Sequence, residues 1–340
     1  MSEIANSLAC LPLFAGLLRE DIQAAAPLWE ARSLPAGEPL WWHGDMAEEL
    51  ALVLSGSLQI RINNKVVGTV EAGELVGEAA AWTRGGRTAS VHAETMASLA
   101  VLPSARLPRL RTQHVAVYDC LLEDALSGLA RRVRQVDREI ARIAYGDGNA
   151  PGRPNQNALG KLWKKLTTTP PRDRPSARQA LRSMPAMTAI SADALTTIEQ
   201  ALTPRHFPAG TPIFLEGDPG ESVFVVASGC IDVIRHVRGG RGERLASLYP
   251  GALVGTGSLL LSERRNASCV AAETTACWVF EMNQPAYKGL RAEPGRVWRE
   301  SILESLRFQI ASADAQLVKL KQGGVRPKIT DYERIRAGLI

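Results

Sequence analysis

The sequence predicts a mainly β fold that occurs twice, each copy ending in a long helix. Three observations support this: segments recur at a fixed offset, short alternating strands are separated by Gly and Asp, and apolar residues at helical spacing close each copy. A chain of 340 residues has room for about two domains. With 45% hydrophobic and 22% charged residues it can bury a core, which excludes wholesale disorder.

The repeat has an offset of 173 residues in its first part. Residues 34–37 (Leu-Pro-Ala-Gly) recur as residues 207–210 (Phe-Pro-Ala-Gly) at this offset of 173. Further along the offset is 178, so that Arg87 matches Arg265. The five extra residues fall around residues 238–242, whose glycines favour a hairpin turn. An insertion at a turn, with the spacing kept on both sides, is typical of a duplicated fold.

Each copy opens with a short helix and continues with short strands. Leu18, Ile22 and Ala25 have helical spacing in the first copy. The strands are expected at residues 39–42, 50–54 and 58–62 in the first copy, and at residues 213–215, 223–226 and 231–234 in the second. Many short strands with turn residues between them predict a closed or double-sheet β unit.

Apolar residues step by three and four along the last part of each copy. They are Leu122, Leu126, Leu129, Val133, Val136, Ile140 and Ile143 in the first copy, and Ile302, Leu306, Ile310, Ala313, Leu317 and Leu320 in the second. This spacing predicts a helix with one apolar side. Residues 122–129 fit packing on their own domain as well as on another helix, whereas residues 133–143 favour helix–helix pairing. We expect an intrachain pseudo-dimer, or a homo-oligomer, through these helices.

The boundaries that follow are a first domain at 1–145, a linker at 146–183, a second domain at 184–322 and a tail at 323–340. Residues 151–183 contain eight Lys or Arg and one Asp, a net charge of +7. The whole chain carries +5, so the remainder is close to −2. A solvated, Pro- and Gly-rich linker is the interpretation, with a docking helix at residues 159–166 or nucleic-acid binding as the alternatives.

The most specific motif lies at residues 73–89. Gly77 permits close backbone approach, and the N–H groups from Ala79 onward can face an anion as the start of a short helix. Arg87 supplies a forked cation that suits a phosphate. Glu78 would repel a phosphate, but it can accept hydrogen bonds from a sugar hydroxyl. A phosphate and a sugar hydroxyl in one pocket indicate a nucleotide, with a local Glu78–Arg87 ion pair as the structural alternative.

This motif resembles the phosphate-binding cassette of cyclic nucleotide-binding domains, in which Gly-Glu and Arg-Thr-Ala are separated by eight residues. The resemblance covers residues 11–145 and 184–320. It implies an α+β, mainly β fold: two jelly-roll-like β-rolls, each flanked by helices and ending in a long C-terminal helix. Relatives that regulate transcription carry a helix-turn-helix after this helix, and none is expected here. The resemblance also implies that the last helix of each domain moves when ligand binds.

The residues that match the cassette are Gly77, Glu78, Ala79, Arg87, Thr88 and Ala89. By resemblance, Gly77, the amides after it and Arg87 hold the cyclic phosphate. Glu78 then binds the ribose 2′-hydroxyl, and Thr88 contacts the phosphate or the edge of the base. Trp82 is interpreted as a core anchor, with stacking on the base as the alternative.

The second candidate ligand site consists of Gly255, Thr256, Gly257, Arg265 and Asn266. The glycine and the arginine are present, but Thr256 replaces the carboxylate and is a shorter, weaker ribose partner. Losing a buried hydrogen bond to a charged acceptor costs about 1.5–3 kcal/mol. We therefore expect the first pocket to be the sensor, and the second to be degenerate or tuned to another ligand.

These features predict a non-catalytic cytoplasmic receptor for cAMP or cGMP, with cyclic di-GMP as another candidate. Thr88 leans weakly toward guanine by resemblance. No enzyme motif is found, no cofactor is expected, and the dispersed histidines predict no metal site. The cysteines, which suit buried and reduced thiols, are Cys10, Cys120, Cys230, Cys269 and Cys277.

We expect the terminal helices to relay ligand binding to a protein effector. The tandem arrangement resembles the regulatory subunit of cyclic-nucleotide-dependent kinases, although the docking helix and inhibitor segment of those subunits are not found before residue 11. DNA binding is not expected, because only residues 322–340 follow the second helix, and no membrane association is predicted. Two alternatives stay open. One is a ligand-free scaffold with degenerate cassettes, and the other is a transcriptional regulator that acts through the basic linker.

Overall fold

The computed structural model describes residues 3–82, 85–145, 174–237 and 241–321. The chain divides into two compact units, Met1–Leu129 and Ala130–Ile340. The boundary lies within helix α5 (Val115–Tyr145), so the second half of this helix belongs to the second unit. The docking helix predicted at 159–166 and the tail at 323–340 lie outside the described residues.

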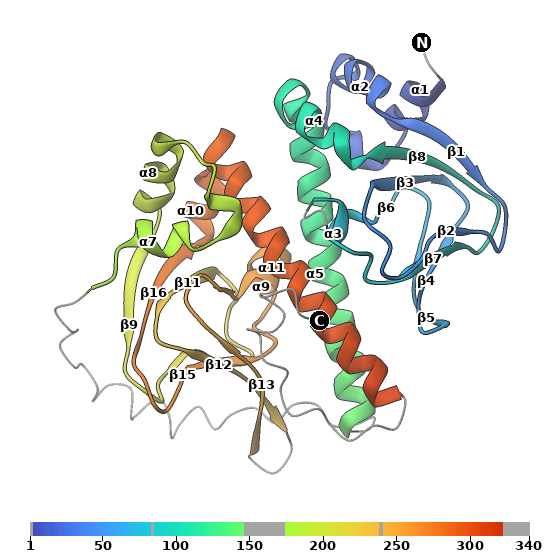
Figure 1. The fold of residues 1–340 in the computed structure, drawn as a ribbon. Helices are drawn as coiled ribbons and strands as arrows, with labels where there is room; N and C mark the ends of the chain where they lie inside the picture. Colours follow the sequence, from blue (N-terminus) through green and yellow to red (C-terminus); the bar gives the residue numbers. More distant parts are fainter. Residues whose placement is uncertain (1–2, 83–84, 146–173, 238–240, 322–340) are drawn as a thin grey trace. The chain divides into compact units, whose positions relative to one another are not determined.

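The first unit contains two four-stranded antiparallel sheets, in the orders β1-β8-β3-β6 and β2-β7-β4-β5 (Figure 1). The strands are β1 (Glu30–Leu34), β2 (Pro39–Trp41), β3 (Glu49–Ser55), β4 (Leu58–Ile62), β5 (Lys65–Val70), β6 (Leu75–Val76), β7 (Ser90–Ala93) and β8 (Ala97–Pro103). The helices are α1 (Glu3–Ala9), η1 (Pro12–Phe14), α2 (Arg19–Ala25), η2 (Ala26–Leu28), α3 (Glu78–Ala81), η3 (Ser104–Arg106), α4 (Leu107–Gln113) and the first half of α5. The predicted alternation is seen in β4, whose residues are buried at every second position.

The second unit repeats this topology strand for strand, in the orders β9-β16-β11-β14 and β10-β15-β12-β13. Its strands are β9 (Thr203–Phe207), β10 (Pro212–Phe214), β11 (Ser222–Ser228), β12 (Ile231–Val237), β13 (Arg241–Leu248), β14 (Leu253–Val254), β15 (Ser268–Ala271) and β16 (Cys277–Asn283). Its helices are α7 (Ala177–Arg182), η4 (Pro185–Met187), α8 (Ala192–Gln200), α9 (Thr256–Leu261), α10 (Gln284–Gly289) and α11 (Ala292–Lys321). The predicted fold of two β-rolls flanked by helices is confirmed.

The five extra residues of the second copy lengthen one hairpin. Strands β4 and β5 with their turn occupy residues 58–70, whereas β12 and β13 with theirs occupy residues 231–248. In the first unit Asn63 and Asn64 both have positive φ, at 48° and 61°, as a tight two-residue hairpin turn requires. The insertion thus lengthens both strands of this hairpin.

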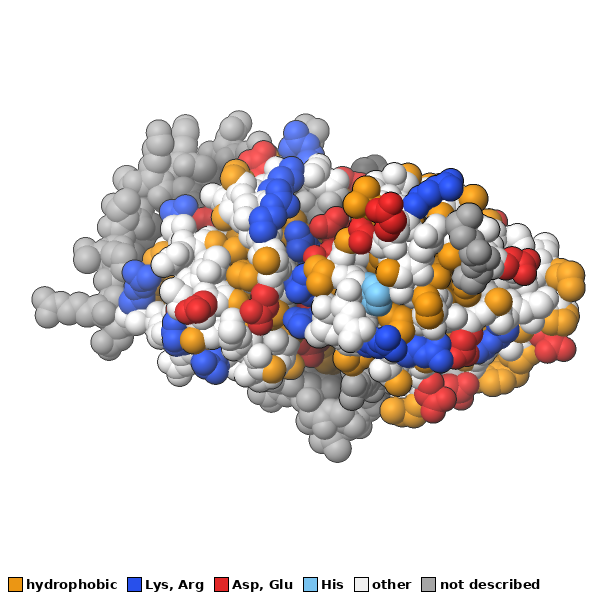
Figure 2. All heavy atoms as spheres, turned by 90° about the horizontal axis from the view of Figure 1, so that it is seen from above, with side chains coloured by type: hydrophobic (Ala, Val, Ile, Leu, Met, Phe, Trp, Pro, Cys, Tyr) orange, Lys and Arg blue, Asp and Glu red, His pale blue; other side chains and the backbone are white. Residues whose placement is uncertain are grey.

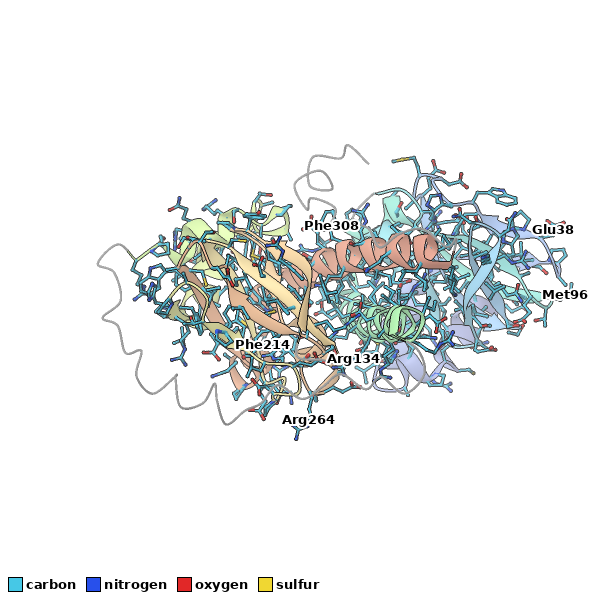
Figure 3. The ribbon with its side chains drawn as sticks, turned by 90° about the horizontal axis from the view of Figure 1, so that it is seen from below. Glu38, Met96, Arg134, Phe214, Arg264 and Phe308 are labelled. Atoms are coloured by element: carbon cyan, nitrogen blue, oxygen red, sulfur yellow. The ribbon has the colours of Figure 1, made fainter. Side chains whose placement is uncertain are left out.

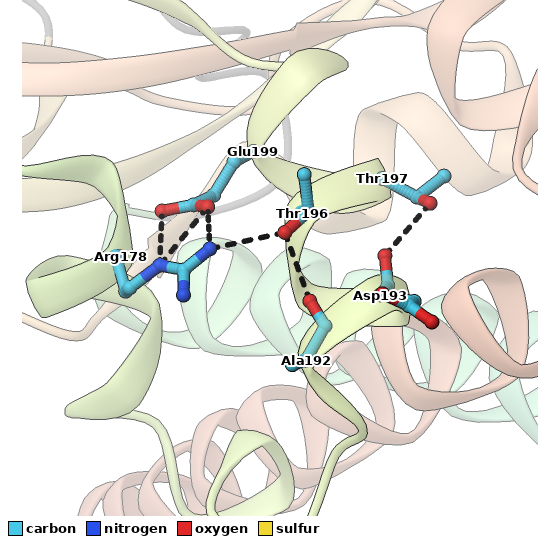
Figure 4. Close-up of polar contacts among 6 residues, drawn as sticks. All are labelled: Arg178, Ala192, Asp193, Thr196, Thr197 and Glu199. Carbon is cyan, nitrogen blue, oxygen red and sulfur yellow. Dashed lines mark hydrogen bonds and ion pairs between the residues drawn. The ribbon is translucent and has the colours of Figure 1, made fainter.

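Helix α7 lies in the stretch that composition assigned to the linker. Its Ala180 and Leu181 are buried, and its Arg178 binds the Glu199 carboxylate of α8 at 2.6 Å and the Thr196 hydroxyl at 3.0 Å (Figure 4). Burial of an apolar side and a charge-assisted contact with α8 join this segment to the second unit. The structured part of that unit therefore begins before residue 184.

The long helices bury their predicted apolar sides. Within the second unit, Val133, Val136 and Ile140 of α5 are buried, as are Ile310, Ala313 and Leu317 of α11. Arg132 of α5 also binds Asp314 of α11 at 3.1 Å. Residues 130–145 of α5 are thus an integral part of the second unit.

Three further features are the charges on the surface, the cysteine thiols and the length of the helices. Acidic and basic side chains are intermingled on the face shown in Figure 2, the ordinary pattern of a protein surface. Burial raises the pKa of the Cys269 and Cys277 thiols to about 12, whereas Cys10 is exposed and departs from the expectation of buried thiols. None of the helices in the described part of the chain is long and apolar enough to cross a bilayer.

Candidate functional site

We call the turn from β6 into α3, with the side chain of Arg87 that bonds to it, the cradle of the first unit. Gly77 caps the start of α3 with a left-handed φ of +84°. A Cβ at this position would lie 2.6 Å from Arg87 Nη1 and 2.7 Å from Trp41 Cη2, so the site tolerates no side chain here. The glycine predicted from the motif is therefore required by both backbone conformation and space.

Arg87 lies at the base of this cradle with its guanidinium buried. Its Nη1 donates to the Gly77 carbonyl at 3.2 Å and its Nη2 to the Glu49 carbonyl at 2.6 Å. The guanidinium carbon stacks 3.6 Å from the centroid of the Trp41 ring. Burial lowers the pKa of Arg87 to about 10, which leaves the side chain charged at neutral pH.

The main chain of Arg87 is held by the Gly-Asp pair upstream. Gly44 N–H donates to the Arg87 carbonyl at 2.9 Å, and Arg87 N–H donates to the Asp45 carbonyl at 2.8 Å. The same two bonds, both of 2.9 Å, hold Arg265 in the second unit. The repeated Gly-Asp motif therefore positions the arginine of each cassette.

Glu78 opens α3 beside the arginine and is half-buried. Its charge raises the pKa of Arg87, as do those of Glu49 and Asp45, all against the larger effect of burial. The Glu49 carboxylate is itself held by both Nη atoms of Arg32, at 2.6 and 2.7 Å. This arrangement places Glu78 at the start of the short helix, next to the charged cradle.

The remaining predicted residues of the first unit surround the cradle or support it. Ala79 and Ala89 are buried, and Thr88 is half-buried directly after Arg87. The Trp82 indole donates to the Tyr118 hydroxyl of α5 at 2.9 Å. This bond supports the interpretation of Trp82 as an anchor between α3 and α5.

The second unit repeats the cradle with different neighbours. Gly255 has a φ of +85° at the start of α9, and Arg265 Nη1 donates to its carbonyl at 3.0 Å. Arg265 Nη2 donates to the carbonyl and the hydroxyl of Ser222, at 2.7 and 3.0 Å. Phe214 takes the place of Trp41, with its ring centroid 4.1 Å from the guanidinium carbon.

Both arginines have one N–H group, at Nε, for which the described residues supply no acceptor. The Nε atoms of Arg87 and Arg265 are buried and have no hydrogen-bond partner among the residues that the structure describes. A buried donor without an acceptor is costly, so it commonly marks a group that an ion, water or ligand completes. Together with the N–H groups at the start of α3 or α9, each cradle fits one anion such as a phosphate.

The carboxylate position is where the two units differ. Thr256 is 1% exposed, and its hydroxyl accepts from Gln309 Nε2 of α11 at 3.5 Å. Asn266, which follows the arginine, donates through Nδ2 to Asp137 Oδ2 of α5 at 3.1 Å. Gly257 lies within α9 with open space beside it. The second cassette thus contacts both long helices within its unit.

A cavity of about 430 Å³ opens at this second cassette. Its walls are the cassette, strands β12 and β13, helix α11 and residues 130–137 of α5. Figure 3 labels Phe214 of β10, Arg134 of α5 and Phe308 of α11, which all line it. The volume is within the range of small-molecule sites.

Several site residues were missed by sequence reasoning. Trp41 and Phe214 are aromatic at the repeat offset of 173, so an aromatic partner for each arginine could have been found. Asp137 and Arg235 lie on elements far from the cassette motif, and no local pattern identifies them. In the part of the chain that the structure covers, no group of three His, Cys, Asp or Glu side chains could hold a metal ion.

Comparison with known proteins identifies the repeated unit. A family model described as the cyclic nucleotide-binding domain matches residues 31–114 and again residues 204–287. A cyclic AMP receptor protein of Thermus thermophilus is 46% identical over 71 residues, which are 21% of this chain and 33% of that protein. A CRP-like cAMP-activated global transcriptional regulator of Mycobacterium tuberculosis is 24% identical over 131 residues, covering 38% of this chain and 57% of that protein.

These matches therefore span between a third and three fifths of the curated relatives. Among solved structures, the regulatory domain of Toxoplasma gondii PKA with cAMP is 18% identical. That likeness covers 87% of this chain and 93% of the other, with a TM-score of 0.32.

Proposed function

Because the chain carries two cyclic nucleotide-binding domains in tandem, at residues 31–114 and 204–287, we propose that it is a non-catalytic cyclic nucleotide receptor. The observation that carries the proposal is the buried arginine of each cradle. Its Nε–H has no acceptor among the described residues, and it lies beside a glycine and the start of a short helix. A cyclic phosphate supplies the missing acceptor.

In the first unit, Gly77, the N–H of Ala79 and Arg87 bind the cyclic phosphate. Glu78 accepts a hydrogen bond from the ribose 2′-hydroxyl, and Thr88 contacts the phosphate or the edge of the base, with Ala89 packing behind it. The support is the position of Glu78 at the start of α3, beside the charged guanidinium. cAMP and cGMP are the ligands of first choice, and cyclic di-GMP is a further candidate.

In the second unit, Gly255, Gly257 and Arg265 form the phosphate site. Thr256 is a weaker ribose partner than a carboxylate, because it makes a neutral hydrogen bond in place of a charged one. Its hydroxyl already accepts a bond from Gln309. The first unit is therefore the tighter sensor, and the second is tuned to a different ligand.

The relay proceeds through α5 to a protein effector. This helix begins in the first unit, and residues from Ala130 onward belong to the second. A ligand shifts an equilibrium only by its differential affinity for the two states. Ligand in the first unit therefore acts on the partner by favouring one position of α5.

Isothermal titration calorimetry with cAMP, cGMP and cyclic di-GMP tests the proposal. We expect binding to the full chain at submillimolar concentration, and loss of the tightest site in Arg87→Gln. Glutamine keeps a buried donor while removing the charge, and thermal unfolding of the variant checks that the unit is folded. Absence of heat with all three ligands would contradict the receptor function and favour a scaffold whose cassettes are empty.

A further inference from the structure

We infer that the pocket of the second unit reads the base of its ligand with Asp137 and Arg235, and that the base it favours is guanine. The inference rests on the proposed function, because it concerns the ligand of one of the two cradles. It assigns a role to Asp137 of α5, and this residue lies outside both matched domain segments.

The two side chains come from different elements and line the same cavity as Arg265. Asp137 belongs to α5 and Arg235 to β12. Arg235 is only 7% exposed, and its Nη2 lies 3.7 Å from Asp137 Oδ1. The other carboxylate oxygen, Oδ2, accepts from Asn266, the residue next to the phosphate-binding arginine.

The contact between the two charges is too long for a hydrogen bond. At 3.7 Å the two charges attract each other, but Arg235 Nη2 and Asp137 Oδ1 do not form a hydrogen bond. Burial raises the pKa of Asp137, whereas the charges of Arg235 and Arg134 lower it. The Asp137 carboxylate keeps 23% of its side-chain surface exposed beside the buried Arg235. Two ionic groups that share a cavity wall without a hydrogen bond to each other are suited to bind a ligand between them.

Guanine presents three polar groups in a row along one edge: the O6 acceptor, the N1–H donor and the 2-amino donor. A carboxylate accepts from two adjacent donors at once, and a guanidinium beside it donates to the O6 acceptor. Adenine presents one amino donor beside one acceptor, so it engages a single carboxylate oxygen. Asp137 with Arg235 therefore complements guanine more fully.

Neighbouring contacts hold Asp137 in place. Arg134, one turn earlier on α5, forms an ion pair with Glu263 and donates to the Arg264 carbonyl, in the loop that leads into Arg265. Residues 130–137 of α5 are thus fixed to the cassette itself. The second pocket lacks a carboxylate at Thr256 but regains one on α5, where it faces the base.

The test uses the full chain with Arg87→Gln, so that the second pocket is the remaining site. Calorimetry compares cGMP, cAMP and inosine 3′,5′-cyclic monophosphate, which lacks the 2-amino group of guanine. We expect cGMP to bind about tenfold or more tightly than either of the others, since each lost contact leaves a buried group unpaired. This comparison requires no change at residue 137.

Asp137→Asn then tests the residue itself. It should weaken cGMP binding about tenfold and reduce the preference for cGMP over the inosine nucleotide to within about twofold. Glu139→Gln is the matched control, because Glu139 lies on the same helix and binds Arg142 outside the cavity. It should leave all three affinities unchanged.

Tighter binding of cAMP than cGMP, or an unchanged preference in Asp137→Asn, would overturn the inference. The inference would also be overturned if the unmodified chain binds cyclic nucleotide and Arg87→Gln does not bind it at all. That outcome would leave the receptor function intact. Absence of binding to the unmodified chain would instead contradict the receptor function itself.

Discussion

At the scale of single residues, the proposed ligand binding depends on two glycines, two arginines and one glutamate. Gly77 and Gly255 have left-handed backbones that bring main-chain carbonyls to Arg87 and Arg265. These residues could be found from the sequence, because the glycine and the arginine lie ten positions apart in one short motif. The repeat offset of 173 also marks Trp41 and Phe214 as equivalent aromatic residues. That each ring stacks on the arginine could not be predicted, since stacking depends on strands that pair only in the folded β-roll.

Replacing Gly255 with alanine should destabilise the second unit. A Cβ there would lie 2.3 Å from Arg265 Nη1, and φ is +85°. We expect a loss of about 1–3 kcal/mol in the free energy of unfolding, measured with urea. Gly257→Ala is the control: it has open space and lies in α9, so stability should stay equal or rise by about 0.5–1 kcal/mol. Equal losses in the two variants would contradict this explanation.

Glu78→Gln should weaken the first site and leave the second unchanged. The substitution keeps the shape but turns a charged acceptor into a neutral one, and a hydrogen bond to a charged group is worth about 1.5–3 kcal/mol. We expect an affinity loss of about tenfold or more at the tighter site, measured by calorimetry. The exposed Glu48→Gln removes the same charge nearby and serves as the control. An unchanged affinity in Glu78→Gln would show that Glu78 does not bind the ribose.

At the scale of elements, most of the features that the sequence did not predict lie on α5. Its apolar spacing correctly predicted one long helix, but spacing alone does not assign its two halves to different units. Asp137 was hidden because its partners, Arg235 and Asn266, lie on the second β-roll. The short helix α7 was also missed, because its Arg residues and the preceding prolines resemble a linker in composition.

The contact between α5 and α11 predicts a specific pH dependence. Asp314 is 3% exposed, and burial raises its pKa despite the bond from Arg132. The folded state therefore holds this proton at a higher pH than the unfolded state does. This group's contribution to stability is lost as pH rises through the raised pKa, and fully present below the ordinary aspartate value. Asp314→Asn should flatten the slope of unfolding free energy against pH in that window, as urea titrations at several pH values would show. An unchanged slope would contradict it.

At the scale of the whole molecule, tandem receptor units predict coupling between ligands. If α5 transmits occupancy of the first unit, saturating that site with cAMP should change cGMP affinity at the second by about fivefold or more. The reverse experiment should give the same factor, because coupling in binding free energy is reciprocal. Competition titrations with fluorescent nucleotides measure both directions. Independent affinities in both directions would contradict the relay through α5.

The most direct test of the central claim is calorimetry on the unmodified chain, the two single variants Arg87→Gln and Arg265→Gln, and the double variant. We expect two sites in the unmodified chain, the loss of a different one in each single variant, and no binding in the double variant, with all four proteins folded by circular dichroism. Cyclic nucleotide binding by the double variant equal to that of the unmodified chain would show that the cradles are not the binding sites.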